Sequence, residues 1–192
     1  MKRIGILGDI GSGKSYVAKK FGYPVFNADN EVARIYKKNK KCYNKLKKKL
    51  PNYITSFPIK KKELTDAIIS NQKNLKKITQ IIHPEVRNRM NNFIKKNKDK
   101  KLIILDIPLL IENKLNKKKY ILIFVDAKKK EINKRLKKRD NFNPKIVEKL
   151  KKLQLPLELK KKRSNFIIKN NFKNNYVKKN VKKILRKILS DA

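Results

Sequence analysis

The chain has 192 residues, 39% of them hydrophobic, so it is long enough to bury the core of one domain with an appendage. Its single cysteine and single histidine exclude a disulfide framework and any zinc site built from these two residue types within one chain. No stretch approaches 18 apolar residues, which excludes a membrane-spanning helix, and the formal charge of +40 points to anionic partners.

The positive charge is spread along the chain rather than gathered in one segment. Only eight of the 55 basic residues are arginine, and the lysines from Lys37 to Lys187 are interspersed with Asn and Ile. This pattern indicates a bias toward AT-rich codons, a hypothesis that a GC-rich genome would contradict. The first apolar run ends at Asp9 and is too short for a signal peptide, so we expect a cytoplasmic protein.

The most informative stretch is residues 8–15, with the sequence Gly-Asp-Ile-Gly-Ser-Gly-Lys-Ser, which follows the apolar run 4–7. In a phosphate-binding loop, a strand ends in a glycine-rich turn that leads into a helix, so backbone N–H groups converge on one phosphate. Lys14 can reach the β- and γ-phosphates, and the Ser15 hydroxyl can ligate Mg²⁺. All five glycines of the chain lie at or near this turn. The predicted nucleotide-binding residues are Gly8, Asp9, Ile10, Gly11, Ser12, Gly13, Lys14, Ser15 and Tyr16.

The first half of the chain continues with mostly helical patterns. Residues 14–21 have the spacing of a helix, and the apolar run before Asp29 predicts a short strand over 24–29. From 30 to 97 the repeated helical spacing predicts a helical insertion, with a non-helical link at 52–57. Pro84 suits the first turn of a new helix within this insertion.

Strand patterns return in the second half, as continuous apolar runs at 102–107, 120–126 and 165–168. Such runs, separated by helical stretches, are typical of parallel strands covered on both faces. The helical stretches are predicted at 128–139, 145–153 and 174–189. The predicted fold is therefore α/β, the three-layer αβα arrangement of P-loop NTPases, with a parallel sheet of about five strands.

Three aspartates, Asp29, Asp106 and Asp126, lie where predicted strands end. Ligands of open parallel sheets bind at the carboxyl ends of the strands, so each is a candidate for nucleotide or metal binding. Each could instead cap the N-terminus of the following helix. This alternative weighs most for Asp126 and least for Asp29.

A phosphate-binding loop does not define the reaction. GTPases need an Asn-Lys-x-Asp element after a strand, which this chain lacks, so switch-type hydrolysis is disfavoured. Kinases of small molecules combine the loop with an acceptor-binding insertion after the second strand and a basic lid over the phosphates. We assign one domain, 1–192, whose core is 1–29, 99–127 and 164–192, whose insertion is 30–98 and whose lid is 128–163.

Six motifs in register resemble those of the dephospho-CoA kinase family, from the first strand to about Asn170. The motifs are residues 8–15, Asn27-Ala28-Asp29 with Arg34, Ile82-His83-Pro84, Asp106-Ile107-Pro108-Leu109-Leu110-Ile111-Glu112, Arg135 with Arg139-Asp140, and Gln154-Leu155-Pro156-Leu157-Glu158 with Lys160. The resemblance implies transfer of the ATP γ-phosphate to the ribose 3′-hydroxyl of dephospho-CoA, the last step of coenzyme A biosynthesis, with Mg²⁺ as cofactor.

The resemblance also implies roles for single residues. Asp29 would accept the proton of the acceptor hydroxyl, and Lys14 would hold the transferred phosphate. Arg139 and Arg135 would reach the ATP phosphates from the lid. The implied metal-binding residues are Ser15 and Asp106.

On the acceptor side, the resemblance implies contacts from Arg34, His83 and Arg87, with Pro108 and Leu109 in the pocket wall. His83 could instead be a structural residue at a helix N-terminus. Four positions depart from the family pattern: Asp9 replaces Gly, Asn27 replaces Asp, Ser164-Asn165 replaces Ala-Asp, and Lys149 replaces Arg.

Two other functions stay open from the residues alone. A kinase of nucleoside monophosphates or another small alcohol would share the loop, but would need arginines that hold an acceptor phosphate, and the insertion has few. A nucleic-acid-binding protein would gather its basic residues on one face with interleaved aromatic residues. The spread of lysine opposes this, so we expect no specific nucleic-acid or membrane partner, and the oligomeric state stays open.

Overall fold

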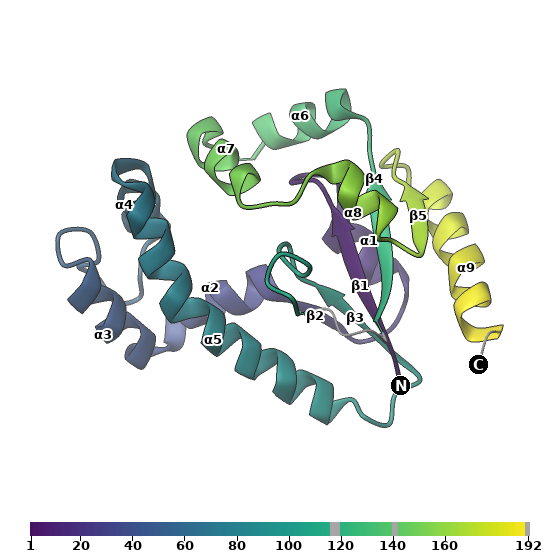
Figure 1. Cartoon of the computed structure of the whole chain (residues 1–192), viewed down its shortest axis with the longest axis horizontal. Coiled ribbons are helices and arrows are strands. Elements are labelled where there is room, and N and C mark those ends of the chain that lie inside the picture. Colours follow the sequence, from purple (N-terminus) through teal and green to yellow (C-terminus); the bar gives the residue numbers. More distant parts are fainter. Residues whose placement is uncertain (116–119, 140–141, 191–192) are drawn as a thin grey trace. The chain divides into compact units, whose positions relative to one another are not determined.

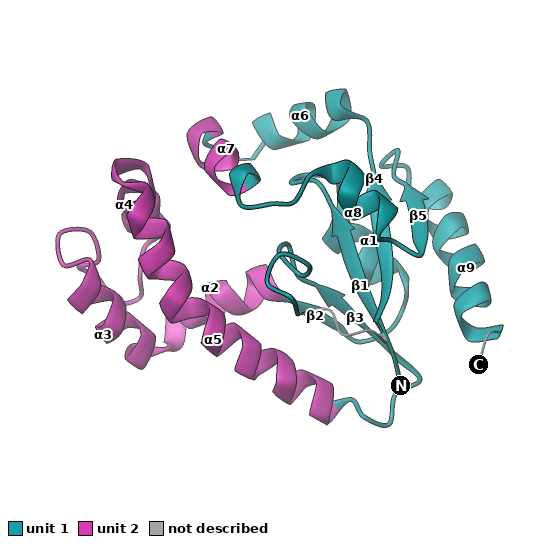
Figure 2. Ribbon diagram, viewed as in Figure 1, with its two compact units in different colours: residues 1–27, 97–143, 151–192 teal, residues 28–96, 144–150 magenta. Residues whose placement is uncertain are grey.

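The computed structural model describes residues 1–115, 120–139 and 142–190. The contacts divide the chain into two compact units, shown in Figure 2. The first unit comprises Met1–Asn27, Asn97–Asn143 and Lys151–Ala192, and the second comprises Ala28–Lys96 and Pro144–Leu150. Asp140, part of a predicted lid motif, lies outside the described residues.

A parallel five-stranded sheet forms the centre of the first unit (Figure 1). Its spatial order is β2-β3-β1-β4-β5, and each neighbouring pair is parallel. The strands are β1 (Lys2–Gly8), β2 (Val25–Asn27), β3 (Leu102–Asp106), β4 (Tyr120–Asp126) and β5 (Phe166–Lys169). The predicted α/β fold with a parallel sheet of about five strands is thus confirmed.

Helices α1 (Lys14–Lys20) and α9 (Asn174–Ser190) cover one face of the sheet. Alternate residues of the central strand, Ile4 and Ile6, join the core with Val17 of α1 and Val177 of α9. This burial of branched side chains on a two-sided sheet explains why the strands are continuous apolar runs.

The opposite face is covered by segment 107–115 and by α8 (Leu157–Lys162), which contacts β1. Gly5 lies on this face, where an added Cβ would stand 2.3 Å from Cδ2 of Leu110. A side chain at position 5 would therefore force Leu110 to move from its present place on the central strand. Helix α6 (Lys129–Lys137) follows β4 and packs against the phosphate loop through Ile132 and Leu136.

The second unit is helical and has its own core. It contains α2 (Ala28–Lys38), α3 (Lys40–Lys49), α4 (Lys61–Ser70), α5 (Gln72–Lys96) and most of α7 (Pro144–Lys152). Fully buried residues such as Ile35, Leu46 and Ile54 pack with Ile78 and Ile82 of α5. No helix in the described part of the chain is long and apolar enough to cross a membrane.

Three elements differ from the prediction. Pro84 lies inside α5 rather than in its first turn, because buried Ile78 and Ile82 before it and Met90 after it hold the helix together across the missing hydrogen bond. The strand ends at Asn27, so Asp29 lies in the first turn of α2. Helix α8 is new, and its six residues are too few for a periodic pattern.

Candidate active site

The phosphate loop connects β1 to α1, and its glycines have conformations that other residues rarely adopt. Gly11 and Gly13 have φ angles of 85° and 87°, in the left-handed region. An added Cβ on Gly13 would stand 2.4 Å from Nδ2 of Asn170, which itself donates to the Ser12 carbonyl at 2.8 Å. The segment after β5 therefore packs directly against the loop, and a side chain at position 13 would separate them.

The ammonium group of Lys14 is hydrogen-bonded to the backbone of this loop. Its Nζ donates to the carbonyl oxygens of Asp9 at 2.7 Å and of Gly8 at 3.3 Å. Two residues further on, Tyr16 is held by α9, since its hydroxyl donates to Oδ1 of Asn174 at 2.8 Å. The ammonium group therefore lies at the mouth of the loop, where anionic oxygens would replace the carbonyls as stronger acceptors.

Asp9, the departure within the loop, bonds to its own turn. Its Oδ1 accepts from the backbone N–H of Ile10 at 2.7 Å, and its Oδ2 lies 4.0 Å from Nζ of Lys151. The backbone N–H of Ser12 donates to the Asp9 carbonyl at 3.2 Å. The extra carboxylate is thus part of the turn's hydrogen bonding and has a cation beside it.

Ser15, Asn27 and Asp106 form a cluster of oxygen-bearing side chains beside the loop. Asn27 is the register partner of Asp106 between β2 and β3, and its Nδ2 donates to Oδ2 of Asp106 and, at 3.2 Å, to Oγ of Ser15. Asp106 is 2% exposed. The structure therefore brings the two predicted metal ligands to one amide group.

A hydroxyl and one carboxylate suit Mg²⁺, which binds to one or two protein oxygens and completes its shell with phosphate oxygens and water. Among residues 1–115, 120–139 and 142–190, no group of three or more His, Cys, Asp or Glu side chains could hold a metal by itself. The residues present thus fit a magnesium ion shared with a nucleotide and do not form a self-sufficient metal centre.

The third strand-end aspartate, Asp126, has a different role. The helix that follows it is capped by Lys128, so the capping alternative is wrong for Asp126. Its Oδ2 lies 3.8 Å from Nζ of Lys161, and its backbone carbonyl accepts from the N–H of Asn170 at 2.6 Å. Asp126 therefore connects β4 to the segment after β5.

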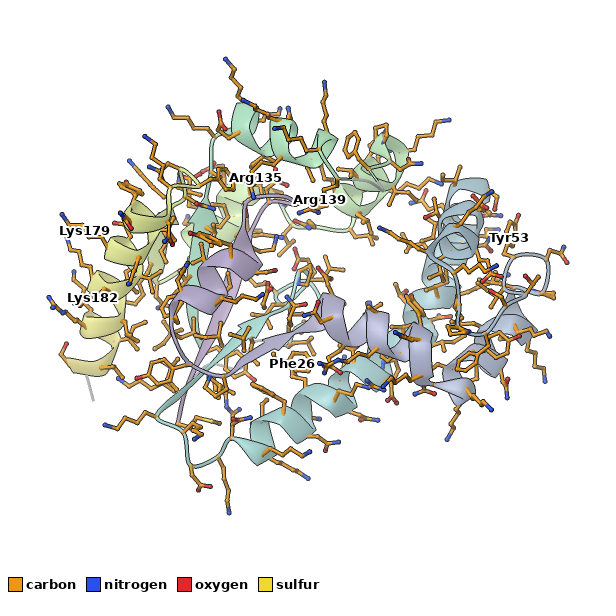
Figure 3. The ribbon with its side chains drawn as sticks, turned by 180° about the vertical axis from the view of Figure 1, so that it is seen from behind. Phe26, Tyr53, Arg135, Arg139, Lys179 and Lys182 are labelled. Atoms are coloured by element: carbon orange, nitrogen blue, oxygen red, sulfur yellow. The ribbon has the colours of Figure 1, made fainter. Side chains whose placement is uncertain are left out.

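The two predicted lid arginines lie on α6 and just beyond it, and Figure 3 labels both. The guanidinium carbon of Arg135 lies 4.4 Å from the centre of the Phe172 ring, and this ring lies next to Gly13. Arg139 is exposed at the C-terminal end of the helix. The Phe172 ring therefore lies next to both Arg135 and Gly13 of the phosphate loop.

Glu112, Lys160 and Gln154 form a buried polar cluster that residue patterns alone did not reveal. Nζ of Lys160, whose side chain is 1% exposed, lies 2.6 Å from Oε1 of Glu112 and donates to Oε1 of Gln154 at 2.9 Å. Oε1 of Glu112 also accepts from the N–H of Leu155 at 3.0 Å. This cluster fixes the segment that carries Pro108 and Leu109, two predicted site residues, to α8.

The predicted acceptor residues Asp29, Arg34, His83 and Arg87 belong to the second unit. Asp29 is exposed in the first turn of α2, and Arg34 pairs with Glu31 at 2.7 Å. Arg87 is exposed on α5, one turn after His83. Burial lowers the pKa of the His83 imidazole, and the charge of Arg87 lowers it further, so both effects favour the neutral ring.

Sequence reasoning missed Arg89. Its guanidinium bonds to Glu85 of its own helix and to Glu31 of α2, each at 3.1 Å, and so connects α5 to the helix that carries Asp29. Arginine stands out in this lysine-rich chain because its planar head can hold two carboxylates at once.

Comparisons with known proteins agree with these observations. The family model for dephospho-CoA kinase matches residues 2–175. A dephospho-CoA kinase of Wolbachia pipientis wMel is 34% identical over 170 residues, which cover 86% of this chain and 87% of that protein. A dephospho-CoA kinase of Bartonella quintana (strain Toulouse) is 33% identical over 173 residues, which cover 88% of each.

Among solved structures, the crystal structure of TT1252 from Thermus thermophilus aligns with a TM-score of 0.77 at 28% identity, over 99% of this chain and 97% of that one. The family model covers far more than half of the chain, and the resemblance inferred from the six motifs is confirmed. The chain belongs to the dephospho-CoA kinase family and is an ATP-dependent kinase.

Proposed function

We propose that this chain transfers the ATP γ-phosphate to the ribose 3′-hydroxyl of dephospho-CoA with Asp29 as base and with Lys14 and Arg139 as phosphate-binding residues. The observation that carries the proposal is the cluster of Ser15, Asn27 and Asp106 beside a complete phosphate loop, in a chain of this family. The core is 1–29, 99–127 and 164–192, the acceptor-binding insertion is 30–98, and the lid is 128–163.

The phosphate loop binds the β- and γ-phosphates of ATP. Residues 8–16 surround the phosphates, the N–H groups at the start of α1 donate to them, and Lys14 exchanges the carbonyl oxygens of Gly8 and Asp9 for phosphate oxygens. Arg135 and Arg139 add guanidinium groups from the lid. Phosphoryl transfer has a loose transition state, so this positioning and charge supply most of the rate acceleration.

Ser15 and Asp106 would hold Mg²⁺ together with the nucleotide. A bound Mg²⁺ ion neutralises charge on the phosphate oxygens. Asn27 keeps the Ser15 hydroxyl and the Asp106 carboxylate facing one another through its amide. The burial of Asp106 excludes water from one side of this carboxylate and keeps its orientation fixed.

The second unit supplies the acceptor side. Asp29 orients the 3′-hydroxyl and takes its proton, while Arg34 and Arg87 attract the anionic part of the acceptor. The neutral imidazole of His83 acts as a hydrogen-bonding group and not as a cation. Pro108 and Leu109 contribute to the wall of the acceptor pocket. ATP is an intracellular metabolite, so we propose the cytoplasm as the compartment.

The test is release of ADP from purified protein with Mg-ATP, in the presence of dephospho-CoA, AMP, CMP or no acceptor. We expect turnover with dephospho-CoA alone. The variant Asp29→Asn should lower kcat about 10²- to 10⁴-fold, the contribution of a general base, and leave the KM for ATP unchanged. Asp66→Asn, at an exposed position on α4, is the matched control and should leave kcat unchanged.

Lys14→Ala should abolish turnover but leave any salt-sensitive binding of RNA intact. Full activity in Asp29→Asn would exclude Asp29 as the base. Turnover only with AMP or CMP would assign the chain to nucleoside monophosphates, and RNA binding without turnover of any acceptor would favour a nucleic-acid-binding protein.

A further inference from the structure

A cavity of about 390 Å³ lies within the first unit beside the phosphate loop. Its walls come from the carboxyl end of β4 with residue 127, the start of α6, and residues 154–157. From the loop itself Asp9 and Ser12 line the cavity, whereas Lys14 and Ser15 do not. The cavity therefore adjoins the phosphate site without being part of the phosphate cradle, and the proposed function does not use it.

The lining combines apolar walls with a few polar groups. Ile132, Leu155 and Leu157 are apolar, and Gln154 contributes a side-chain amide. Ser12 is 1% exposed, and its Oγ has no hydrogen-bond partner among the described residues. A buried hydroxyl without a partner destabilises the folded protein by roughly 1–3 kcal/mol. A ligand that forms a hydrogen bond with it would recover part of this free energy on binding.

The lining of the cavity carries charges of both signs in equal number. The exposed residues Lys129 and Lys151 line it. Two carboxylates, of Asp9 and Asp126, also line it, but Lys151 lies 4.0 Å from the first, and Lys161 lies 3.8 Å from the second. The lysines thus offset both acids, so the two carboxylates do not impose a net repulsion on an anionic group of a ligand.

The wall at 154–157 is held in place before any ligand binds. Glu112 accepts the N–H of Leu155 at 3.0 Å, and Lys160, paired with Glu112 at 2.6 Å, donates to Gln154 at 2.9 Å. A preformed wall lowers the entropic cost of ligand binding. The buried ion pair thus gives the cavity a fixed side, as binding sites for small molecules commonly have.

We propose that this cavity holds the pantetheine arm of dephospho-CoA, an inference that rests on the proposed function. Along this substrate the reacting ribose is followed by the 5′-diphosphate and then by the arm, which has apolar carbons and two amides. The ribose reacts at the phosphate loop, the lysines suit the diphosphate, and the apolar walls with Gln154 and Ser12 suit the arm. The adenosine half of the same substrate is the competing occupant.

The test compares two leucines of similar exposure, Leu157 at 38% and Leu153 at 36%. Leu157 lines the cavity, and Leu153 does not belong to its lining. We expect Leu157→Ala to raise the KM for dephospho-CoA about three- to tenfold, because the variant loses part of the apolar contact between this side chain and the bound arm. The kcat and the KM for ATP should be unchanged. Leu153→Ala should behave like the wild-type protein.

The second measurement uses 4′-phosphopantetheine, a fragment that carries the arm without adenosine. We expect it to inhibit competitively against dephospho-CoA, and Leu157→Ala should raise its inhibition constant by the factor found for the KM. If Leu157→Ala raised only the KM for dephospho-CoA, the cavity would hold the adenosine half instead. A rise in the KM for ATP, or no change at all, would overturn the proposal. In each case turnover of dephospho-CoA by the wild-type protein would keep the proposed function intact.

Discussion

At the scale of single residues, the amide of Asn27 explains how a buried carboxylate is tolerated beside the phosphate loop. Asp106 is 2% exposed, and a buried carboxylate needs hydrogen-bond donors to offset its lost hydration. Nδ2 of Asn27 supplies one, from a neighbouring strand in register. An aspartate at position 27 would instead place a second negative charge against the first. The asparagine at position 27 therefore stabilises the Asp106 carboxylate without requiring a metal ion.

We predict that Asn27→Asp makes stability depend on magnesium. Two adjacent carboxylates repel each other unless a cation lies between them. The melting temperature in EDTA should fall by about 2–8 °C, which corresponds to a loss of about 1–2 kcal/mol in a domain of this size. Millimolar Mg²⁺ should restore it, as followed by differential scanning fluorimetry.

The control for this variant is Asn91→Asp, at an exposed position on α5. Its melting temperature should be the same in EDTA and in Mg²⁺. An equal response of the two variants to Mg²⁺ would exclude a metal position between residues 27 and 106.

The ion pair of Lys160 and Glu112 is a second feature that belongs to single residues. Their side chains are 1% and 9% exposed, so removal of one partner leaves a buried charge without its counter-ion. We predict that Lys160→Met or Glu112→Leu alone costs about 3–5 kcal/mol of unfolding free energy. The double variant should cost far less than the sum of the two, as measured by urea denaturation.

Lys161 offers a matched control one residue along α8. Its pair with Asp126 is 38% and 39% exposed, so Lys161→Met should cost less than about 1 kcal/mol. Additive costs for the Glu112 and Lys160 variants would mean that the two charges are not energetically coupled.

At the scale of elements, Glu63 of α4 organises the non-helical link that precedes its helix. Its two carboxylate oxygens accept from the backbone N–H groups of Thr55, Ser56 and Lys60 and from two hydroxyls. Burial alone would raise the pKa of Glu63, but these hydrogen bonds outweigh it and lower the pKa to about 2. The charged form of Glu63 thus stabilises the link between α3 and α4.

The low pKa of Glu63 predicts how stability depends on pH. The ordinary value is 4.5, so the stabilising contribution is complete above that pH and is lost as the pH falls toward 2. The melting temperature of the wild-type protein should therefore exceed that of Glu63→Gln at pH 6, and the difference should shrink between pH 4.5 and 2. A difference that stayed constant over this range would contradict the assigned pKa. Asp66→Asn, on the same helix, should show no such trend.

At the scale of the whole molecule, the 55 basic residues far outnumber the 15 acidic residues. The formal charge is +40, and exposed lysines lie on helices of both units, such as Lys179 and Lys182 of α9, whose side chains extend into solvent in Figure 3. Like charges on the same unit repel each other, and at 0.1 M salt this repulsion is largely screened beyond about 10 Å.

We therefore predict that the melting temperature rises with ionic strength. An increase from 0.05 to 0.5 M NaCl should raise it by several degrees, and KCl should do the same, because screening does not depend on the identity of the cation. Calorimetry at fixed pH measures the effect. A flat or falling response would show that self-repulsion does not limit stability.

Local patterns in the sequence determined much of this protein. The phosphate loop, the apolar strands and the inner face of α9 depend on glycine spacing and on hydrophobic periodicity, which are properties of neighbouring residues. Six short motifs then identified the family, which the comparisons confirmed. The roles of Asp29, Arg139 and His83 stay predictions, because they depend on bound substrates.

Tertiary structure alone decided the features that need contacts between distant segments. Asn27 and Asp106 are 79 residues apart and meet only because β2 pairs with β3. Packing around Ile78, Ile82 and Met90 carries α5 through Pro84 against its local preference. Lys160 is one of many lysines in the sequence, and only the fold buries it against Glu112. Burial and pairing across the chain are collective properties, so they override local propensity and cannot be inferred from neighbours along the sequence.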